Sequence, residues 1–229
     1  MKPSLISLSL LTAAHASTAS QVPGFDISNW QPTFNFTAAY ASGARFCILK
    51  ATEGSDFLDK SFPSHFSRAT AANLIRGAYH FAWPVSDATA SQQADFFIAH
   101  GGGWTADGRT LPGMLDMESV ASKPRCWGLG TGEMVAWIGE FSDRYRERTT
   151  RYPMIYTNPS WWKECTGDSA AFRDTNPLVL ARWASAVGTI PGGWAAQTIW
   201  QNSDSYEFGG DSDFFNGSEE DLKRFAMGS

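Results

Sequence analysis

Short apolar runs bounded by turn-forming residues recur along the chain from residue 22 onward. Such runs are typical of buried β-strands. Seven clear runs and a weaker eighth are predicted to be strands: 22–27, 45–51, 76–82, 111–117, 152–157, 178–183, 197–201 and 211–214. Between them, apolar positions recur at helical spacing in 62–69 after Ser61, in 90–98 with Asp87 as the expected N-cap, in 134–145, and in 222–225 after Ser218.

The alternation of strands and helices predicts a parallel α/β fold. Eight strands in about 210 residues favour a closed barrel, at the short end for that fold. The connections after residue 157 are short and rich in glycine and proline, so the last three strands are expected to lack full helices. An open doubly wound sheet is the alternative, although no G-x-G-x-x-G motif follows the first strand. No linker or repeat divides the chain, which predicts a single domain.

The first 20 residues differ in kind from the rest. Lys2 precedes the apolar segment 5–14, and the small residues Ala14-His15-Ala16 follow it. This is the order of a secretory signal peptide, so we expect cleavage near residues 16–20 and a mature domain of residues 21–229. A buried first helix is the alternative reading. No later apolar run has the length of a membrane span.

Charge, cysteines and sequons refine this picture. Lys and Arg number 18 and Asp and Glu 23, so removal of Lys2 takes the net charge from −5 to −6. An acidic chain argues against nucleic acid as a partner. Cys47 lies in an apolar strand pattern and is predicted to be a free core thiol, whereas Cys126 and Cys165 lie in polar surroundings and are predicted to pair.

Two further features follow from secretion and from the scarcity of metal ligands. Asn35 and Asn216 begin N-glycosylation sequons, which are candidates for modification in a secreted protein. Three cysteines without a CxxC spacing and four scattered histidines make a zinc site improbable, so no metal and no cofactor are expected.

Polar and aromatic residues gather at the predicted ends of the strands, where α/β barrels carry their functional groups. The sharpest signal is Asp116-Met117-Glu118, which follows an apolar strand. Side chains alternate along a strand, so the two carboxyl groups face the same way on Cα atoms about 6.5 Å apart. Their repulsion raises one pKa, which supplies the protonated acid and the charged carboxylate that glycosidic cleavage requires.

Two other interpretations of this acidic pair stay open. A D-x-E sequence also occurs as a surface pair or in divalent-metal sites, so a Mg²⁺-dependent phosphohydrolase is one alternative. The position of Asp116 and Glu118 after a buried strand favours catalysis, since Asp26 and Asp211 are expected at the same rim. Trp30, Trp83, Trp183 and Trp200 also lie at or just past strand ends, and flat aromatic faces there suit sugar rings.

The ordered motifs identify a family resemblance that covers essentially the whole mature chain. They are GFDIS at 24–28, FCILKATEG at 46–54, RGAYHFA at 76–82, LPGMLDME at 111–118, YPMIYTN at 152–158, WQ at 200–201 and GGDSDFFNGS at 209–218. Together they resemble glycoside hydrolase family 25, the Chalaropsis-type lysozymes. The resemblance implies a modified TIM-like (β/α)5(β)3 barrel, and cleavage of the β-1,4 bond between N-acetylmuramic acid and N-acetylglucosamine in bacterial peptidoglycan, without a metal.

The resemblance also implies roles for individual residues. Glu118 matches the general acid, Asp116 the second carboxylate of the same strand, and Asp26 the aspartate of the first strand. Asp211 matches the aspartate of the last strand, and a small register shift would put Asp213 there instead. The expected substrate-binding residues are Lys50, His80, Tyr156, Trp183, Trp200, Gln201 and Asp213. Relatives often carry tyrosine where this chain has Trp183.

The expected reaction retains the anomeric configuration with assistance from the substrate N-acetyl group, while a direct Asp116 nucleophile or inversion stays open. A chitinase-like hydrolase and an inactive sugar-binding barrel are the remaining alternatives. We expect a secreted monomer that contacts neither nucleic acid nor membrane. The acidic charge predicts an optimum on the acidic side of neutrality, where repulsion from an anionic wall weakens.

Overall fold

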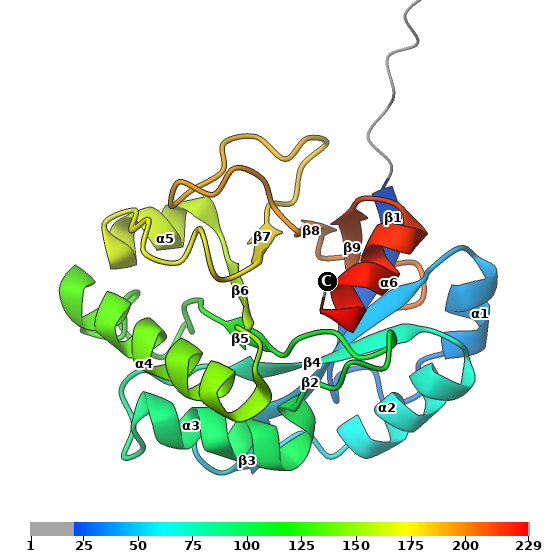
Figure 1. The fold of residues 1–229 in the computed structure, drawn as a ribbon, viewed down its shortest axis with the longest axis horizontal. Coiled ribbons are helices and arrows are strands. Elements are labelled where there is room, and N and C mark those ends of the chain that lie inside the picture. The colour runs from blue at the N-terminus through cyan, green and yellow to red at the C-terminus, as the bar shows by residue number, and fades with distance from the viewer. Residues whose placement is uncertain (1–20, 229) are drawn as a thin grey trace, which may run out of the picture.

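The computed structural model describes residues 21–228, so the predicted signal peptide lies outside the described residues. Eight strands form the wall of a closed barrel, at the positions that the apolar runs predict (Figure 1). In chain order they are β1 (Gln21–Ile27), β2 (Phe46–Glu53), β4 (Ile75–Phe81), β5 (Met114–Asp116), β6 (Met154–Thr157), β7 (Leu178–Ala181), β8 (Ile199–Ser203) and β9 (Asp211–Asn216).

The barrel closes through its first strand. Strand β1 pairs in parallel with β2, and parallel pairing continues through β4, β5, β6, β7 and β8. Strand β9 runs antiparallel to both β8 and β1, which closes the ring. A short strand that the sequence analysis missed, β3 (Phe57–Leu58), extends β2 as a hairpin. Five strand–helix units followed by three strands confirm the predicted (β/α)5(β)3 barrel.

The helices lie outside this wall. They are α1 (Phe36–Ala41), α2 (Phe62–Ala71), α3 (Ala90–Phe97) with its π-helical continuation η1 (Ile98–Gly102), α4 (Thr131–Thr149), α5 (Pro159–Thr166) and α6 (Glu219–Met227). The predicted helices correspond to α2, α3, α4 and α6. Thr89 rather than Asp87 caps α3, because Thr89 and Gln92 form a reciprocal capping box. Helices α1 and α5 were not predicted.

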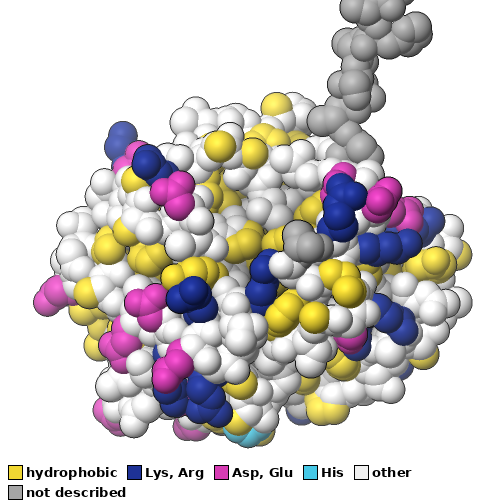
Figure 2. All heavy atoms as spheres, in the orientation of Figure 1, with side chains coloured by type: hydrophobic (Ala, Val, Ile, Leu, Met, Phe, Trp, Pro, Cys, Tyr) yellow, Lys and Arg dark blue, Asp and Glu magenta, His cyan; other side chains and the backbone are white. Residues whose placement is uncertain are grey.

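The barrel interior is layered. The layer near the start of the parallel strands is apolar, with Phe46, Met154 and Ile199 buried together. Leu222 and Ala226 of α6 join this cluster, so α6 closes the end of the barrel at which the parallel strands begin. Figure 2 views the face that carries α6, on which acidic and basic side chains are interspersed. The polar residues of the interior therefore lie towards the opposite end, where the parallel strands finish.

The cysteines lie as predicted. Cys126 and Cys165 form a disulfide, and Cys47 is a buried free thiol on the outward side of β2. Of the two sequon asparagines, Asn35 is exposed and its Oδ1 caps α1 by accepting from the Ala38 N–H. Asn216 is exposed too, but its Nδ2 donates to the Gln197 carbonyl.

Candidate active site

Asp116 and Glu118 project together from the carboxyl end of β5. Met117 between them points the other way, into the core beneath α4, and is fully buried. Asp116 is 5% exposed and Glu118 is partly exposed. The Oδ1 atom of Asp116 is buried without a hydrogen-bond partner among the described residues. The alternation expected from the sequence thus places an unpartnered carboxylate oxygen beside a more accessible glutamate.

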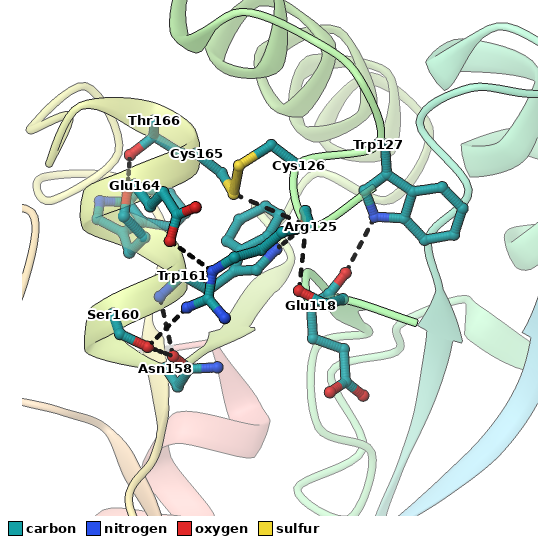
Figure 3. The surroundings of a disulfide bond; sticks show 12 residues. Glu118, Arg125, Cys126, Trp127, Asn158, Ser160, Trp161, Glu164, Cys165 and Thr166 are labelled. Atoms are coloured by element: carbon teal, nitrogen blue, oxygen red, sulfur yellow. Dashed lines mark hydrogen bonds and ion pairs between the residues drawn. A yellow bond between two sulfur atoms is a disulfide. The ribbon is translucent and has the colours of Figure 1, made fainter. Parts of the chain in front are cut away.

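A disulfide-anchored loop holds the backbone of Glu118 (Figure 3). Trp127 directly follows Cys126 in the chain, and its indole N–H donates to the Glu118 carbonyl at 3.0 Å. The disulfide fastens this loop to α5, and the Trp161 indole N–H donates to the Arg125 carbonyl at 3.0 Å. In Figure 3 the Glu118 carboxyl group points away from the disulfide. The clamp therefore fixes the main chain of Glu118 and leaves its side chain free.

A second carboxyl pair faces the barrel interior from β1 and β9. Asp26 and Asp211 are directly opposite in the antiparallel register of these strands. Gln201 of β8 bridges them, because its Nε2 donates to Asp26 Oδ2 at 2.7 Å and to Asp211 Oδ2 at 3.1 Å. Its Oε1 accepts from the Tyr156 hydroxyl at 2.9 Å and from the Trp183 indole N–H at 3.0 Å. One amide thus joins four side chains of the predicted site.

The choice between Asp211 and Asp213 has a geometric basis. Both face the interior, but Asp211 is partly exposed and lines a cavity, whereas Asp213 is 1% exposed. Asp213 pairs with Gly24, one layer below the pair formed by Asp26 and Asp211. Asp211 is therefore the carboxyl group that a substrate can reach, and Asp213 lies beneath it.

Burial and the repulsion of neighbouring carboxylates raise the pKa of every member of the carboxylate cluster, defined as Asp26, Asp116, Glu118 and Asp211. Burial, followed by the charge of Asp211, raises the pKa of Glu118 to about 7 and that of Asp26 to about 7. Burial, followed by the nearby Asp204, raises the pKa of Asp211 to about 6. Burial and then Glu118 raise the pKa of Asp116 well above its usual value. After burial, the charge of Asp211 is the first cause that holds protons on both Glu118 and Asp26.

A cation and an aromatic group complete this side of the rim. Lys50 of β2 forms an ion pair with Glu53 at 2.6 Å and lowers the pKa of both Glu118 and Asp116. The Trp83 indole N–H donates to the other oxygen of Glu53 at 2.9 Å. Glu53 thus gives Lys50 the carboxylate partner that a nearly buried ammonium group requires.

Two hollows open at this rim. One of about 210 Å³ is lined by Asp26, Ile27, Ser28, Trp30, Gln31, Tyr79, Gly210 and Asp211. The other, of about 160 Å³, is lined by Glu53, Gly54, Ser55, Asp56, Phe57, Trp83 and Ser86. Trp30 is 84% exposed and Trp183 59% exposed, so flat aromatic faces stand at the mouth. Of the carboxylate cluster, Asp26 and Asp211 line the first hollow and no member lines the second. A mainly apolar cavity of about 360 Å³ lies elsewhere, between α2, β3 and η1.

Of the expected substrate-binding residues, Gln201 is occupied by the four hydrogen bonds described above, and three more do not reach the cleft. His80 is fully buried on the outward side of β4, where its ring nitrogens contact Thr52 at 2.8 Å and Gln93 at 3.0 Å. Trp200 packs outside the wall against Phe214, and its indole N–H donates to a backbone carbonyl. Asp213 is covered by the layer above it. These expectations are corrected, because burial and satisfied hydrogen bonds remove the side chains from the cleft.

Two features were missed at the sequence level. Tyr79, adjacent to His80, faces the interior and lines the larger rim hollow. The role of Trp127 depends on the fold of a loop, although its place next to Cys126 in a predicted disulfide was a usable signal. Within residues 21–228, no group of three or more His, Cys, Asp or Glu side chains is arranged to hold a metal ion.

Comparisons with known proteins point in one direction. The family described as "Glycosyl hydrolases family 25" matches residues 25–211. An N,O-diacetylmuramidase of Chalaropsis sp is 62% identical over 211 residues, which is 90% of this chain and 100% of that protein. The structure of a muramidase from Trichobolus zukalii is 58% identical with a TM-score of 0.89, over 91% of this chain and 100% of that one. A family GH25 lysozyme from Aspergillus fumigatus is 52% identical with a TM-score of 0.88, over 90% and 99%.

Proposed function

This chain belongs to glycosyl hydrolases family 25, and on that premise we propose that it is a muramidase of bacterial peptidoglycan. It cleaves the β-1,4 bond between N-acetylmuramic acid and N-acetylglucosamine. The observation that carries the proposal is the pair Asp116 and Glu118, side by side at an aromatic rim, with the pKa of Glu118 raised to about 7. A carboxyl group that keeps its proton near neutrality is what a glycosidic leaving oxygen requires.

Glu118 acts as the general acid and then as the general base. It donates its proton to the leaving oxygen while cationic character develops at the anomeric carbon. The charge of Asp211 raises the pKa of Glu118 and so keeps the proton in place before the reaction. Once Glu118 is ionised, it accepts a proton from the water that attacks the anomeric carbon.

Asp116 orients the substrate N-acetyl group, which is the internal nucleophile. Asp116 lies beside Glu118 and its carboxyl group makes no hydrogen bond with the described residues, so the carboxyl oxygen other than the buried Oδ1 is the one that accepts a hydrogen bond from the N-acetyl N–H. That contact turns the acetyl oxygen towards the anomeric carbon, and two displacements then give net retention. Asp211 supplies negative charge on the opposite wall and Asp26 carries a proton there below about pH 7. Lys50 and Trp183 complete the substrate-facing rim, and the buried Tyr156 contributes through its hydrogen bond to Gln201.

The working conditions follow from the same groups. The reaction requires protonated Glu118 beside ionised Asp211, so we expect activity to fall as the pH rises through about 7 and the optimum to lie on the acidic side of neutrality. Residues 1–20 are proposed to direct secretion, and the disulfide between Cys126 and Cys165 suits an oxidising compartment. The protein is proposed to act as a monomer. No helix of residues 21–228 is long and apolar enough to cross a membrane.

The test is digestion of purified peptidoglycan followed by mass analysis of the released fragments. A muramidase leaves N-acetylmuramic acid at the new reducing ends, and proton NMR of the first product shows whether the anomer is retained. Glu118→Gln is the matched inactive control. N-acetylglucosamine at the reducing ends, cleavage of chitin oligomers instead, or loss of activity in EDTA would each refute the proposal and point to one of its alternatives.

A further inference from the structure

We propose that Gln201 is a positioning residue for this proposed muramidase, and that the Trp183 indole N–H fixes its amide so that both N–H groups point at Asp26 and Asp211. The inference rests on the proposed function, which makes these two carboxyl groups part of the active site. It reassigns Gln201, which the sequence placed among substrate-binding residues. It also gives Trp183 a task other than stacking on a sugar.

The hydrogen-bond capacity of Gln201 is fully used inside the protein. An amide has two N–H donors and one oxygen that accepts two bonds. The donors go to Asp26 at 2.7 Å and to Asp211 at 3.1 Å, and the oxygen accepts from Tyr156 at 2.9 Å and Trp183 at 3.0 Å. Gln201 is 2% exposed, so no sugar hydroxyl reaches it without breaking one of these bonds.

Trp183 determines which way the amide faces. An indole N–H is a donor only, whereas the Tyr156 hydroxyl donates or accepts. Trp183 therefore requires the oxygen of Gln201 on its side, and the N–H groups must then lie against the two carboxyl groups. A flipped amide would place an N–H against an N–H and an oxygen against Asp26 and Asp211. Trp183 is 59% exposed, yet its polar atom points inward at Gln201.

The consequence is electrostatic. A hydrogen bond to an ionised carboxylate favours ionisation, and the bond from Gln201 lowers the pKa of Asp26 against the effect of burial. The charge of Asp211 in turn raises the pKa of Glu118. The other ionisable groups around this site are Asp213 on β9, Asp116 on β5, Tyr79 on β4, Tyr156 on β6, Lys50 and Glu53 on β2, and Asp204 in the loop before β9. Gln201 is the neutral donor shared by two adjacent acids.

Without the fixed amide, the pH range over which kcat/KM is high should therefore become narrower at both its acidic and its basic limb. The carboxyl pair would ionise at a higher pH, which moves the acidic limb upward. A less charged Asp211 would hold the Glu118 proton less firmly, which moves the basic limb downward. A side chain that only filled space would lower the height of the profile without moving either limb.

The experiment is a double-mutant cycle with Trp183→Phe and Gln201→Met, which keep an aromatic ring and a similar volume. The pH dependence of kcat/KM on solubilised peptidoglycan is measured for all four proteins. We expect Trp183→Phe to lower kcat about tenfold, the order of one lost hydrogen bond, and to narrow the profile. In the Gln201→Met background the same change should have no further effect on kcat or on the limbs.

Additive effects of the two substitutions, or a Trp183→Phe variant altered only in KM, would overturn the inference and leave Trp183 as a sugar-stacking platform. Trp104→Phe is the matched control, because the Trp104 indole N–H bonds the Ala226 carbonyl of α6 at the other end of the barrel. A carboxyl ¹³C NMR titration of Asp26 and Asp211 needs no substrate. Unchanged titration in Trp183→Phe contradicts the positioning role even if the wild-type protein cleaves no peptidoglycan, so the two failures are distinguishable.

Discussion

Replacing Glu118 by glutamine should stabilise the protein while it removes activity. The pKa of this carboxyl group rises from 4.5 to about 7 on folding, chiefly through burial. A raised pKa means that the folded state holds the proton more tightly, so stability falls as the pH increases from 4.5 to about 7. At about 1.4 kcal/mol per pH unit, the full span corresponds to a loss of about 3 kcal/mol in the free energy of unfolding. The Glu118→Gln variant does not undergo this loss, because glutamine does not ionise.

The two readouts should move in opposite directions. At pH 4 the unfolding free energies of wild type and Glu118→Gln should agree, and at pH 8 the variant should be about 3 kcal/mol more stable. For a domain of this size that is a rise in Tm of roughly 10 °C. Lysis of purified walls should fall by about 10²- to 10⁴-fold, the range for loss of a general acid.

The assay is urea unfolding at pH 4 and pH 8 alongside release of reducing ends from peptidoglycan. Glu207→Gln is the control, because Glu207 is exposed and the same change of chemistry there should alter neither quantity. A stability gain that is equal at both pH values would refute the electrostatic reasoning. Near-normal lysis by Glu118→Gln would remove this residue from the reaction.

Three further predictions concern other groups. Burial, followed by the charges of Asp26 and Asp211, raises the pKa of Asp213, whose carboxyl group lies against that of Asp26. Asp213→Asn should therefore be more stable than wild type, with a gain larger at pH 7 than at pH 4, and an equal gain in urea melts at both values would contradict this. Replacing Cys126 and Cys165 by serine removes a disulfide that spans 39 residues and should lower the free energy of unfolding by up to about 4 kcal/mol. The value of kcat should also fall, because Trp127 would no longer hold the backbone of Glu118 in place. An unchanged urea midpoint would contradict this prediction. Burial lowers the pKa of His80 from 6.5 to about 4, so the stability of the wild type should fall as the pH drops between these values. His80→Gln should lose less stability over this range, and its kcat at pH 6 should stay within about threefold of wild type. A much lower kcat in a folded variant would indicate that His80 belongs to the active site.

The sequence was informative about the strands because β2, β4, β5, β6 and β7 are buried on both sides and read as apolar runs. It was less informative about which residues at a strand end face the cleft. Neighbouring residues on a strand point to opposite sides, so Trp200 and Gln201 cannot both reach the interior, and Gln201 does. Tyr79 and His80 follow the same rule, and the strand-end pattern does not reveal which of the two turns inward.

Other details depended on contacts between distant segments. The orientation of Gln201 on β8 results from contacts with β6, β1, β9 and the segment that follows β7, which no local pattern contains. Asp211 and Asp213 share one face of one strand, so alternation alone did not separate them. The depth of each within the barrel did, and depth is a property of the register between β9 and β1.

Because α6 closes one end of the barrel and the carboxylate cluster lies at the other, stability and substrate preference can be altered at separate places in this protein. Leu222 and Ala226 fill the end opposite the carboxylate cluster, in an apolar layer with Val22, Phe46 and Ile199. Repacking that layer would adjust heat resistance through dispersion contacts and leave the proton-carrying groups undisturbed. Substitutions intended to raise thermal stability would therefore be placed in the apolar layer beneath α6, and substitutions intended to change the sugar preference would be placed at the exposed tryptophans of the opposite rim.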